Sequence, residues 1–488
     1  RRATDRLKDL EFKSYLIPIT NEVGFHTTFA SLPTRMPFAT VEDYENYLAR
    51  LAAYPSFCEQ NIELMRRGME IGFVLPRVVL EGYEATILPH TAEDPTQTVF
   101  WRPFEAIPSS VPEAEHERLR AAGRAVIEEA VSPAYEEFLT FITSEYIPGC
   151  RDTIAASDLP NGVDYYDFLV RYHTTLDITP EEVHAVGNRE VERIRSEMLE
   201  IIDEVRFEGD LDDFLQFLRT DPRFFPKTAE ELLKEASFIA KKIDGRLPAL
   251  FKTLPRQPYG VEPVPAHLAP KYTAGRYSGA AIDGTRAGFY WVNTYALDSR
   301  TLWALVALTL HEAVPGHHLQ NALRQELTDL PNFRRFSRIN AYGEGWGLYS
   351  EWLGLEVGMY EDPYDDFGRL SYEAWRACRL VVDTGMHALG WSRQQAMDFM
   401  RENTALSLHE ITTETDRYIA WPGQALAYKM GQIKILELRR RAEEKLGTAF
   451  DVREFHDVIL LNGPVPLTVL EEQVDAYIEA TLRGSPST

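Results

Sequence analysis

The chain has 488 residues, of which 44% are hydrophobic and 26% charged, as in ordinary globular proteins. Its 51 basic and 75 acidic residues give a formal net charge of -24, which argues against nucleic acid and anionic lipid as partners. The three cysteines lie far apart without a Cys-x-x-Cys pair, which excludes a disulfide scaffold and a cysteine-ligated zinc site but leaves one disulfide open.

Helical patterns dominate the chain. Capping patterns at Thr40, Thr179 and Thr228 precede amphipathic runs to about Arg67, Val205 and Phe251, and Ser392 opens a short one. Further helical runs are expected over residues 112–144, 299–327, 332–358, 364–389, 421–446 and 466–483.

The region from Leu254 to Val292 breaks this pattern. It carries five prolines between 255 and 270, and residues 287–293 read as a short strand. We therefore place a boundary near 255, between an N-terminal helical lobe (1–255) and a second lobe (256–488). The second lobe contains the histidines at 311, 317 and 318, and it is therefore expected to be the metal-binding catalytic lobe. The expected fold is mainly α, with a small β-sheet beside the helices that carry these histidines.

A metal-binding pattern begins where His311 and Glu312 follow an apolar helical run. In the common His-Glu-x-x-His form, one helical turn aims both histidines at one ion. Here Pro315 interrupts that spacing, and the next histidines are His317 and His318.

Geometry alone leaves the second histidine open. On a regular helix His318 faces the same way as His311, within about 20°, but lies about 10.5 Å along the axis. Pro315 and Gly316 make a regular helix improbable, and a local bulge would return His317 to the metal.

A third ligand is expected from a neighbouring helix. Glu344 and Glu351 are seven residues apart, so they share one helix face. The glycines at 343, 345 and 347 allow another helix to approach closely. Together with the histidines, these carboxylates indicate a metal site rather than polar groups satisfied within a helical core.

The run from His311 to Gln320, followed by Glu344 to Glu351, resembles the bacterial domain-of-unknown-function family 885. Most of the chain shares this resemblance, which leaves one continuous family domain as the alternative to two lobes. The family is similar to gluzincin metallopeptidases such as thimet oligopeptidases and Taq-type carboxypeptidases. The resemblance implies a zincin-like, two-lobed helical fold.

This resemblance also implies roles for the residues. In the related peptidases a glycine precedes the second histidine ligand. Gly316 precedes His317 in this chain, so the resemblance favours His317 over His318. Glu344 matches their glutamate ligand, and Glu351 matches a glutamate that supports the ligands from behind. One zinc ion per chain is expected on His311, His317 and Glu344, with Glu312 as the general base.

Other residues are candidates for contact with the reacting groups. His387, Tyr418 and Tyr428 are the expected donors to the oxyanion, and Asp383 is placed to orient His387 four residues later. Asn293 and Tyr277 are expected to contact substrate. Arg276 either has a structural role or holds a substrate carboxylate.

The sequence therefore predicts a zinc-dependent hydrolase that cleaves short peptides. A metal-dependent amidase acting on a non-peptide substrate and a catalytically silent peptide-binding protein are the alternatives. No apolar run reaches the ~18 residues of a transmembrane helix. A soluble protein is expected, either cytoplasmic or exported with its signal removed, with no prediction of oligomeric state.

Overall fold

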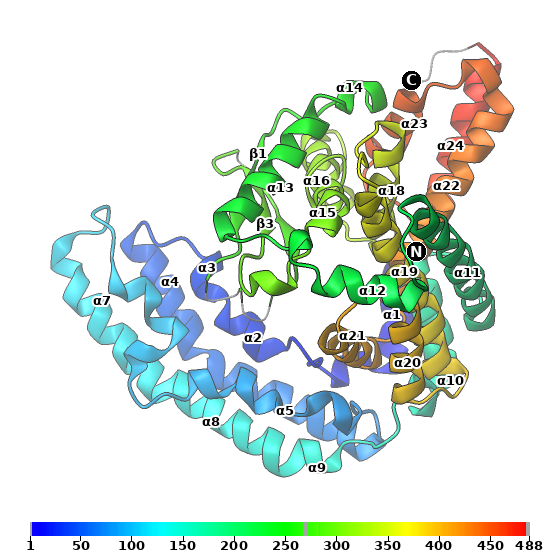
Figure 1. The fold of residues 1–488 in the computed structure, drawn as a ribbon. Helices are drawn as coiled ribbons and strands as arrows, with labels where there is room; N and C mark the ends of the chain where they lie inside the picture. Colours follow the sequence, from blue (N-terminus) through cyan, green and yellow to red (C-terminus); the bar gives the residue numbers. More distant parts are fainter. Residues whose placement is uncertain (1, 267–268, 270–271, 283, 485–488) are drawn as a thin grey trace. The chain divides into compact units, whose positions relative to one another are not determined.

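A computed structural model describes residues 2–266, 269, 272–282 and 284–484 (Figure 1). The expected mainly α fold with a small sheet is confirmed. The chain forms two compact units. The first contains Arg1–Tyr166, Met386–Ser392 and Thr412–Pro422, and the second contains Asp167–Gly385, Arg393–Ile411 and Gly423–Thr488.

The division after Tyr166 differs from the boundary expected near 255. The proline-rich segment does not link two bodies, because it builds a sheet that packs on the helix preceding it. The hydroxyl of Tyr259 donates to the carbonyl of Ala240 and to Oδ1 of Asp244, both at 3.2 Å. Residues on both sides of 255 thus share one core.

The first unit is helical and rich in buried aromatic side chains. The rings of Tyr54 and Tyr135 stack at 4.6 Å, and both are fully buried. The run expected from 41 to 67 is two helices separated at Ala53. The helices are α1 (Arg2–Phe12), α2 (Phe25–Ala30), α3 (Leu32–Arg35), α4 (Val41–Ala52), α5 (Tyr54–Ile71), α6 (Arg102–Glu105), α7 (Glu113–Val126), α8 (Ser132–Phe141) and α9 (Ile147–Gly149).

Most of the remaining helices belong to the second unit, and α10, α19 and α21 have residues in both units. The helices are α10 (Gly162–Thr174), α11 (Pro180–Glu204), α12 (Leu211–Thr220), α13 (Ala229–Asp244), α14 (Leu247–Leu250), α15 (Leu305–Glu312), α16 (His317–Glu326), α17 (Asn332–Arg335), α18 (Asn340–Glu356), α19 (Pro363–Ala388), α20 (Arg393–Asn403), α21 (Leu408–Ala420), α22 (Leu426–Leu446), α23 (Val452–Leu460) and α24 (Leu467–Leu482).

The capping patterns at Thr179 and Thr228 are confirmed. Each threonine hydroxyl accepts the amide three residues later, at 3.2 Å and 3.0 Å, and so satisfies a donor that the first helical turn leaves unpaired.

The sheet has three strands in the order β1-β3-β2. Strand β3 (Gly288–Val292) pairs in parallel with β1 (Tyr259–Pro263) and antiparallel with β2 (Gly275–Ser278). Strand β3, which lies where the sequence predicted a strand, is central and buries Tyr290 and Val292.

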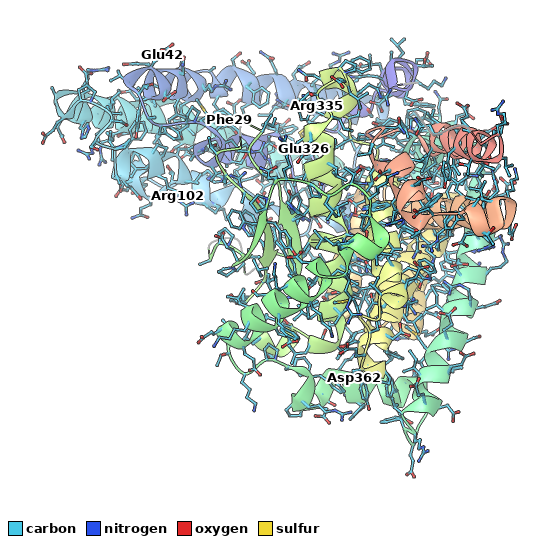
Figure 2. All side chains as sticks on the ribbon, turned by 90° about the horizontal axis from the view of Figure 1, so that it is seen from above. Phe29, Glu42, Arg102, Glu326, Arg335 and Asp362 are labelled. Atoms are coloured by element: carbon cyan, nitrogen blue, oxygen red, sulfur yellow. The ribbon has the colours of Figure 1, made fainter. Side chains whose placement is uncertain are left out.

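Helices α15, α18 and α22 form the centre of the second unit. Gly345 and Gly431 let α18 and α22 meet closely, since a Cβ at Gly345 would lie 2.5 Å from Cα of Gly431. Figure 2 shows Glu326 and Arg335 toward one end of this unit and Asp362 toward the other.

The three cysteines are buried free thiols, so the disulfide left open by the sequence is absent from the described structure. Among the described helices, none combines the length and the apolar character needed to span a bilayer.

Candidate metal centre

A break between α15 and α16 sets the positions of the two histidines. Helix α15 ends at Glu312, and α16 begins at His317. A Cβ at Gly316 would lie 1.9 Å from the carbonyl oxygen of His311, so only glycine fits there. The break brings the rings of His311 and His317 to a centroid distance of 4.7 Å.

A buried tryptophan on α18 holds this break in place. The indole Nε1 of Trp346 donates to the carbonyl of Pro315 at 2.8 Å, and the Trp346 side chain is fully buried. The turn is therefore anchored to the same helix that carries Glu344.

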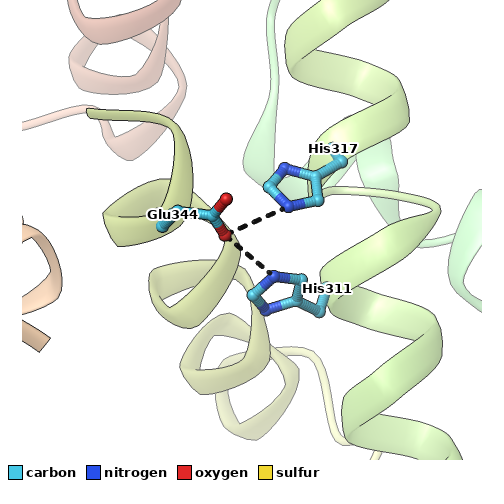
Figure 3. Close-up of side chains that lie close together, drawn as sticks. All are labelled: His311, His317 and Glu344. Atoms are coloured by element: carbon cyan, nitrogen blue, oxygen red, sulfur yellow. Dashed lines mark ion pairs between the residues drawn. The ribbon is translucent and has the colours of Figure 1, made fainter. Parts of the chain in front are cut away.

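His311, His317 and Glu344 converge from three helices (Figure 3). Oε2 of Glu344 lies 3.7 Å from Nε2 of His311 and 3.5 Å from Nε2 of His317. The three ligand atoms lie within 4.8 Å of one another, and the described residues contain no other such group. A tetrahedral zinc ion with bonds of about 2.0–2.1 Å would hold its ligand atoms roughly 3.3 Å apart, which is close to both distances between Glu344 and the histidines.

Glu351 lies behind this group. Nδ1 of His311 and Oε1 of Glu351 are 2.7 Å apart, and both side chains are buried. Because a carboxylate accepts at Nδ1, a proton belongs there, which leaves Nε2 as the ring nitrogen available to a metal. This is the tautomer that a metal requires. Nη2 of Arg376 lies 3.7 Å from the same carboxylate oxygen.

Gly347 makes room for the His311 ring. A Cβ at position 347 would lie 2.5 Å from Cε1, 2.7 Å from Nε2 and 2.9 Å from Nδ1. Any side chain here would displace the imidazole. In contrast, a Cβ at Gly343 would meet nothing closer than 3.8 Å.

Without a metal, the charges of the group compensate one another. Burial lowers the pKa of His311, but hydrogen bonds to Glu344 and Glu351 outweigh it and raise the pKa to about 10. Burial raises the pKa of Glu344, but the two histidines hold it well below its usual range. Two imidazoles facing one carboxylate are a donor set that suits zinc.

Glu312 lies on the strand side of the group. Its Oε2 accepts the amide of Tyr277 on β2 at 2.8 Å, and within the described chain Oε1 has no hydrogen bond. The carboxylate is thus oriented by backbone while one oxygen stays available as an acceptor.

Residues 2–474 match the family described as "Bacterial protein of unknown function (DUF885)". The chain belongs to this family. The match is continuous across the boundary that was expected near 255, and no curated protein matches the chain.

Two solved structures are similar to this DUF885 chain. One, described as "putative lipoprotein from Colwellia psychrerythraea", is 33% identical with a TM-score of 0.87, and the match covers 92% of this chain and 78% of that one. The other, a "putative lipoprotein of unknown function from Shewanella oneidensis", is 18% identical with a TM-score of 0.71, covering 96% and 85%. Because its sequence identity is only 18%, the second structure supports a shared fold and nothing about function.

His318, the alternative to His317, is directed elsewhere in this DUF885 chain. Its Nδ1 lies 3.1 Å from the hydroxyl of Tyr277, and its Nε2 lies 3.1 Å from the carbonyl of Gln257. Both ring nitrogens are therefore engaged in hydrogen bonds, and burial lowers the pKa of His318 to about 4.

The expected substrate residues lie on or beside the sheet. Asn293 is fully buried, and its amide nitrogen donates to the carbonyls of Ala269, Tyr272 and Thr273, so its donor groups are engaged by backbone. Arg276 is exposed, with its guanidinium 5.4 Å from the ring centre of Tyr272.

His387 and Tyr418 belong to the first unit, whereas the metal group belongs to the second. Nδ1 of His387 accepts the amide of Ala156 at 2.9 Å, and Nε2 lies 3.0 Å from the carbonyl of Tyr418. The hydroxyl of Tyr418 donates to Oε2 of Glu414 at 2.6 Å.

The expected orientation of His387 by Asp383 is not what the structure shows. Backbone groups already occupy both ring nitrogens of His387, and both oxygens of Asp383 accept the amide of Gly423, at 3.0 Å and 3.1 Å. Tyr428, half-buried on α22, lies in the second unit under the guanidinium of Arg379 at 4.5 Å.

Sequence reasoning missed Arg376 and the amide of Tyr277. Arg376 sits in a long amphipathic helix, where an arginine carries no sign of burial. The signal available for Tyr277 was the predicted sheet beside the catalytic helices, since an adjacent strand offers backbone donors to them.

Proposed function

We propose that this chain is a zinc-dependent hydrolase that cleaves peptide bonds in short peptides, in the manner of gluzincin metallopeptidases. The observation that carries the proposal is the convergence of His311, His317 and Glu344, with the carboxylate of Glu312 one residue from a ligand. Pure binding requires no such carboxylate.

The residues present fit a zinc ion. Two imidazoles and one carboxylate leave a fourth position open, as in catalytic rather than structural zinc sites. The buried Glu351 sets the tautomer of His311 that a metal needs. When bound, zinc would activate a water molecule and polarise the scissile carbonyl.

Glu312 is the proposed general base. It takes the proton of the attacking water through Oε1 and later delivers it to the leaving amine. The Tyr277 amide holds the other oxygen, which restricts rotation of the carboxylate during both transfers.

Tyr428 is the proposed donor to the oxyanion among the three candidates. The hydrogen bonds of His387 and Tyr418 engage their polar atoms within the first unit. Tyr428 belongs to the unit of the metal group, and the described residues provide no hydrogen bond to its hydroxyl.

The test is turnover of a panel of quenched short peptides by the wild type and Glu312→Gln. Turnover by the wild type and its loss in the variant, with metal retained in both, is the expected result. Turnover of a small amide but no peptide would replace the peptidase by an amidase. Peptide binding without turnover of either would overturn the enzyme proposal.

We also propose that the chain is exported. The 33% identical relative from Colwellia psychrerythraea is described as a putative lipoprotein, which favours the exported alternative over the cytoplasmic one. Fractionation of cells that express the full-length gene tests this proposal, and recovery solely in the cytoplasm would contradict it.

A further inference from the structure

A cavity of about 90 Å³ lies within the second unit, between α15, β3 and α19. Its apolar wall includes Val292, Leu305 and Leu308. Since a liquid water molecule occupies roughly 30 Å³, the cavity has room for a small chemical group rather than for a single trapped water.

One lining residue of this cavity lies a helical turn before the proposed general base. Leu308 precedes Glu312 by one helical turn, which is about 6 Å along α15. Strand β2 follows the helix over the same stretch, because Gly275 packs toward Leu308 and the amide of Tyr277 donates to Glu312. A substrate lying along β2 would therefore reach both the carboxylate and the cavity.

The polar lining of the cavity is rich in donors. Arg300 is half-buried, and within the described chain the one hydrogen bond of its side chain runs from Nε to the carbonyl of Tyr295 at 3.0 Å. Trp303 and Ser371 also line the cavity, and both side chains are more than nine-tenths buried. Their Nε1 and Oγ atoms have no partner among the described residues.

Charge distinguishes Arg300 from these two residues. In the described structure no carboxylate lies within the 4.0 Å of an ion pair to its guanidinium. Burial lowers the pKa of Arg300, and the more distant carboxylates of Glu410 and Asp298 oppose this shift only in part. The carboxylate among the lining residues, Glu410, is exposed and accepts hydrogen bonds from the amide and hydroxyl of Ser407. A half-buried guanidinium without an ion-pair partner can accommodate an anionic ligand.

We propose that this cavity binds a carboxylate group of the substrate, with Arg300 as its cationic partner and the apolar wall around the adjoining carbon atoms. Two sources supply this chemistry in a peptide, the C-terminal carboxylate and an acidic side chain. The proposal rests on the proposed hydrolase function and names its substrate preference.

The catalytic test uses two pairs of peptides. One pair differs in a C-terminal carboxylate or carboxamide, and the other in an internal glutamate or glutamine. In the wild type we expect kcat/KM to favour the carboxylate by about tenfold or more in one pair, which identifies its source. Arg300→Gln should reduce that ratio to near one, whereas Arg300→Lys should retain part of it.

Arg256→Gln is the matched control, because Arg256 is exposed and pairs with Glu326. It should leave both ratios unchanged. Equal kcat/KM within both pairs in the wild type, or a preference that survives in Arg300→Gln, would overturn the proposal.

A binding measurement separates this proposal from the hydrolase function. Calorimetry with 3-phenylpropionate and its amide is performed on His317→Phe, so that the acid cannot bind through the metal. We expect the acid to bind more tightly than the amide, and Arg300→Gln in that background to abolish the difference. Equal affinity for the acid and the amide would overturn the assignment of the cavity, even if the protein cleaves peptides. Tighter binding of the acid that depends on Arg300 would support the assignment, even if the protein cleaves no peptide.

Discussion

Nδ1 of His311 lies 2.7 Å from Oε1 of Glu351, seven residues after Glu344 on the same helix. One face of α18 therefore provides both a candidate ligand and the acceptor that orients another ligand. Supporting hydrogen bonds of this kind raise the basicity of a histidine ligand and fix its ring.

Replacing Glu351 should weaken metal binding. Glu351→Gln removes the charge that holds the proton on Nδ1, so zinc affinity should fall roughly 10- to 100-fold. A competitive titration with a chromogenic chelator measures the change. Glu356→Gln is the control, because Glu356 lies on the same helix but pairs with Arg439. Equal zinc affinity in the two variants would contradict the role given to Glu351.

Gly347→Ala should disrupt the centre by steric contact. The new Cβ would lie within 2.9 Å of three atoms of the His311 ring, so the ring must move and zinc affinity should fall at least about tenfold. Gly343→Ala introduces the same atom on the same helix with open space around it, and its higher helix propensity should stabilise the protein by up to about 1 kcal/mol. Zinc titration and thermal unfolding of both variants check the contrast. Normal zinc affinity in Gly347→Ala would show that His311 is not bound to the metal as described.

The two adjacent histidines should respond differently to the same substitution. His317→Phe should abolish stoichiometric zinc binding, because Nε2 of His317 faces Glu344. His318→Phe should keep the metal and lose stability, since it leaves the carbonyl of Gln257 without its ring partner. The zinc content of both purified variants tests this prediction. Zinc retained in His317→Phe and lost in His318→Phe would show that the second ligand is misassigned.

The stability of the protein should decrease in acid because of buried histidines such as His456. Burial lowers the pKa of His456 to about 3, while hydrogen bonds engage both ring nitrogens. Below the unfolded pKa of about 6.5, the unfolded chain binds a proton that the native state rejects. The free energy of unfolding should therefore fall from pH 6.5 toward pH 3, by up to about 1.4 kcal/mol per pH unit from this residue.

Urea unfolding at pH 4.5, 5.5 and 7 tests the contribution of His456. His456→Gln removes the titrating group, so the pH dependence below 6.5 should become shallower by about that amount. An unchanged slope in the variant would show that His456 is protonated in the native state or contributes nothing to the acid sensitivity.

The parts of the fold that local interactions decide could be predicted from the sequence. The caps at Thr179 and Thr228 depend on an amide three residues away, and Glu344 and Glu351 share a face through helical periodicity alone. The shared face of Glu344 and Glu351, together with the histidines that follow an apolar helical run, led to the expectation of one metal site.

Long-range contacts decided the rest. Whether His317 or His318 turns toward His311 depends on the fit of Gly316 against the His311 carbonyl and on the bond from Trp346 to Pro315. The sequence placed a boundary near 255 because prolines mark irregular chain, and the partners of Tyr259 show that this chain packs on the helix before it. Asp383 and His387 have the right spacing for a hydrogen bond, but backbone groups occupy the ring.

The most direct test of the metal centre is zinc content, measured on protein purified without chelator, together with peptide turnover. The wild type and Glu312→Gln should each contain about one zinc per chain, since Glu312 is not a ligand, and turnover should occur in the wild type alone. Glu344→Gln should lose both zinc and activity. Wild-type protein without stoichiometric metal, or full zinc retention in Glu344→Gln, would contradict the proposed centre.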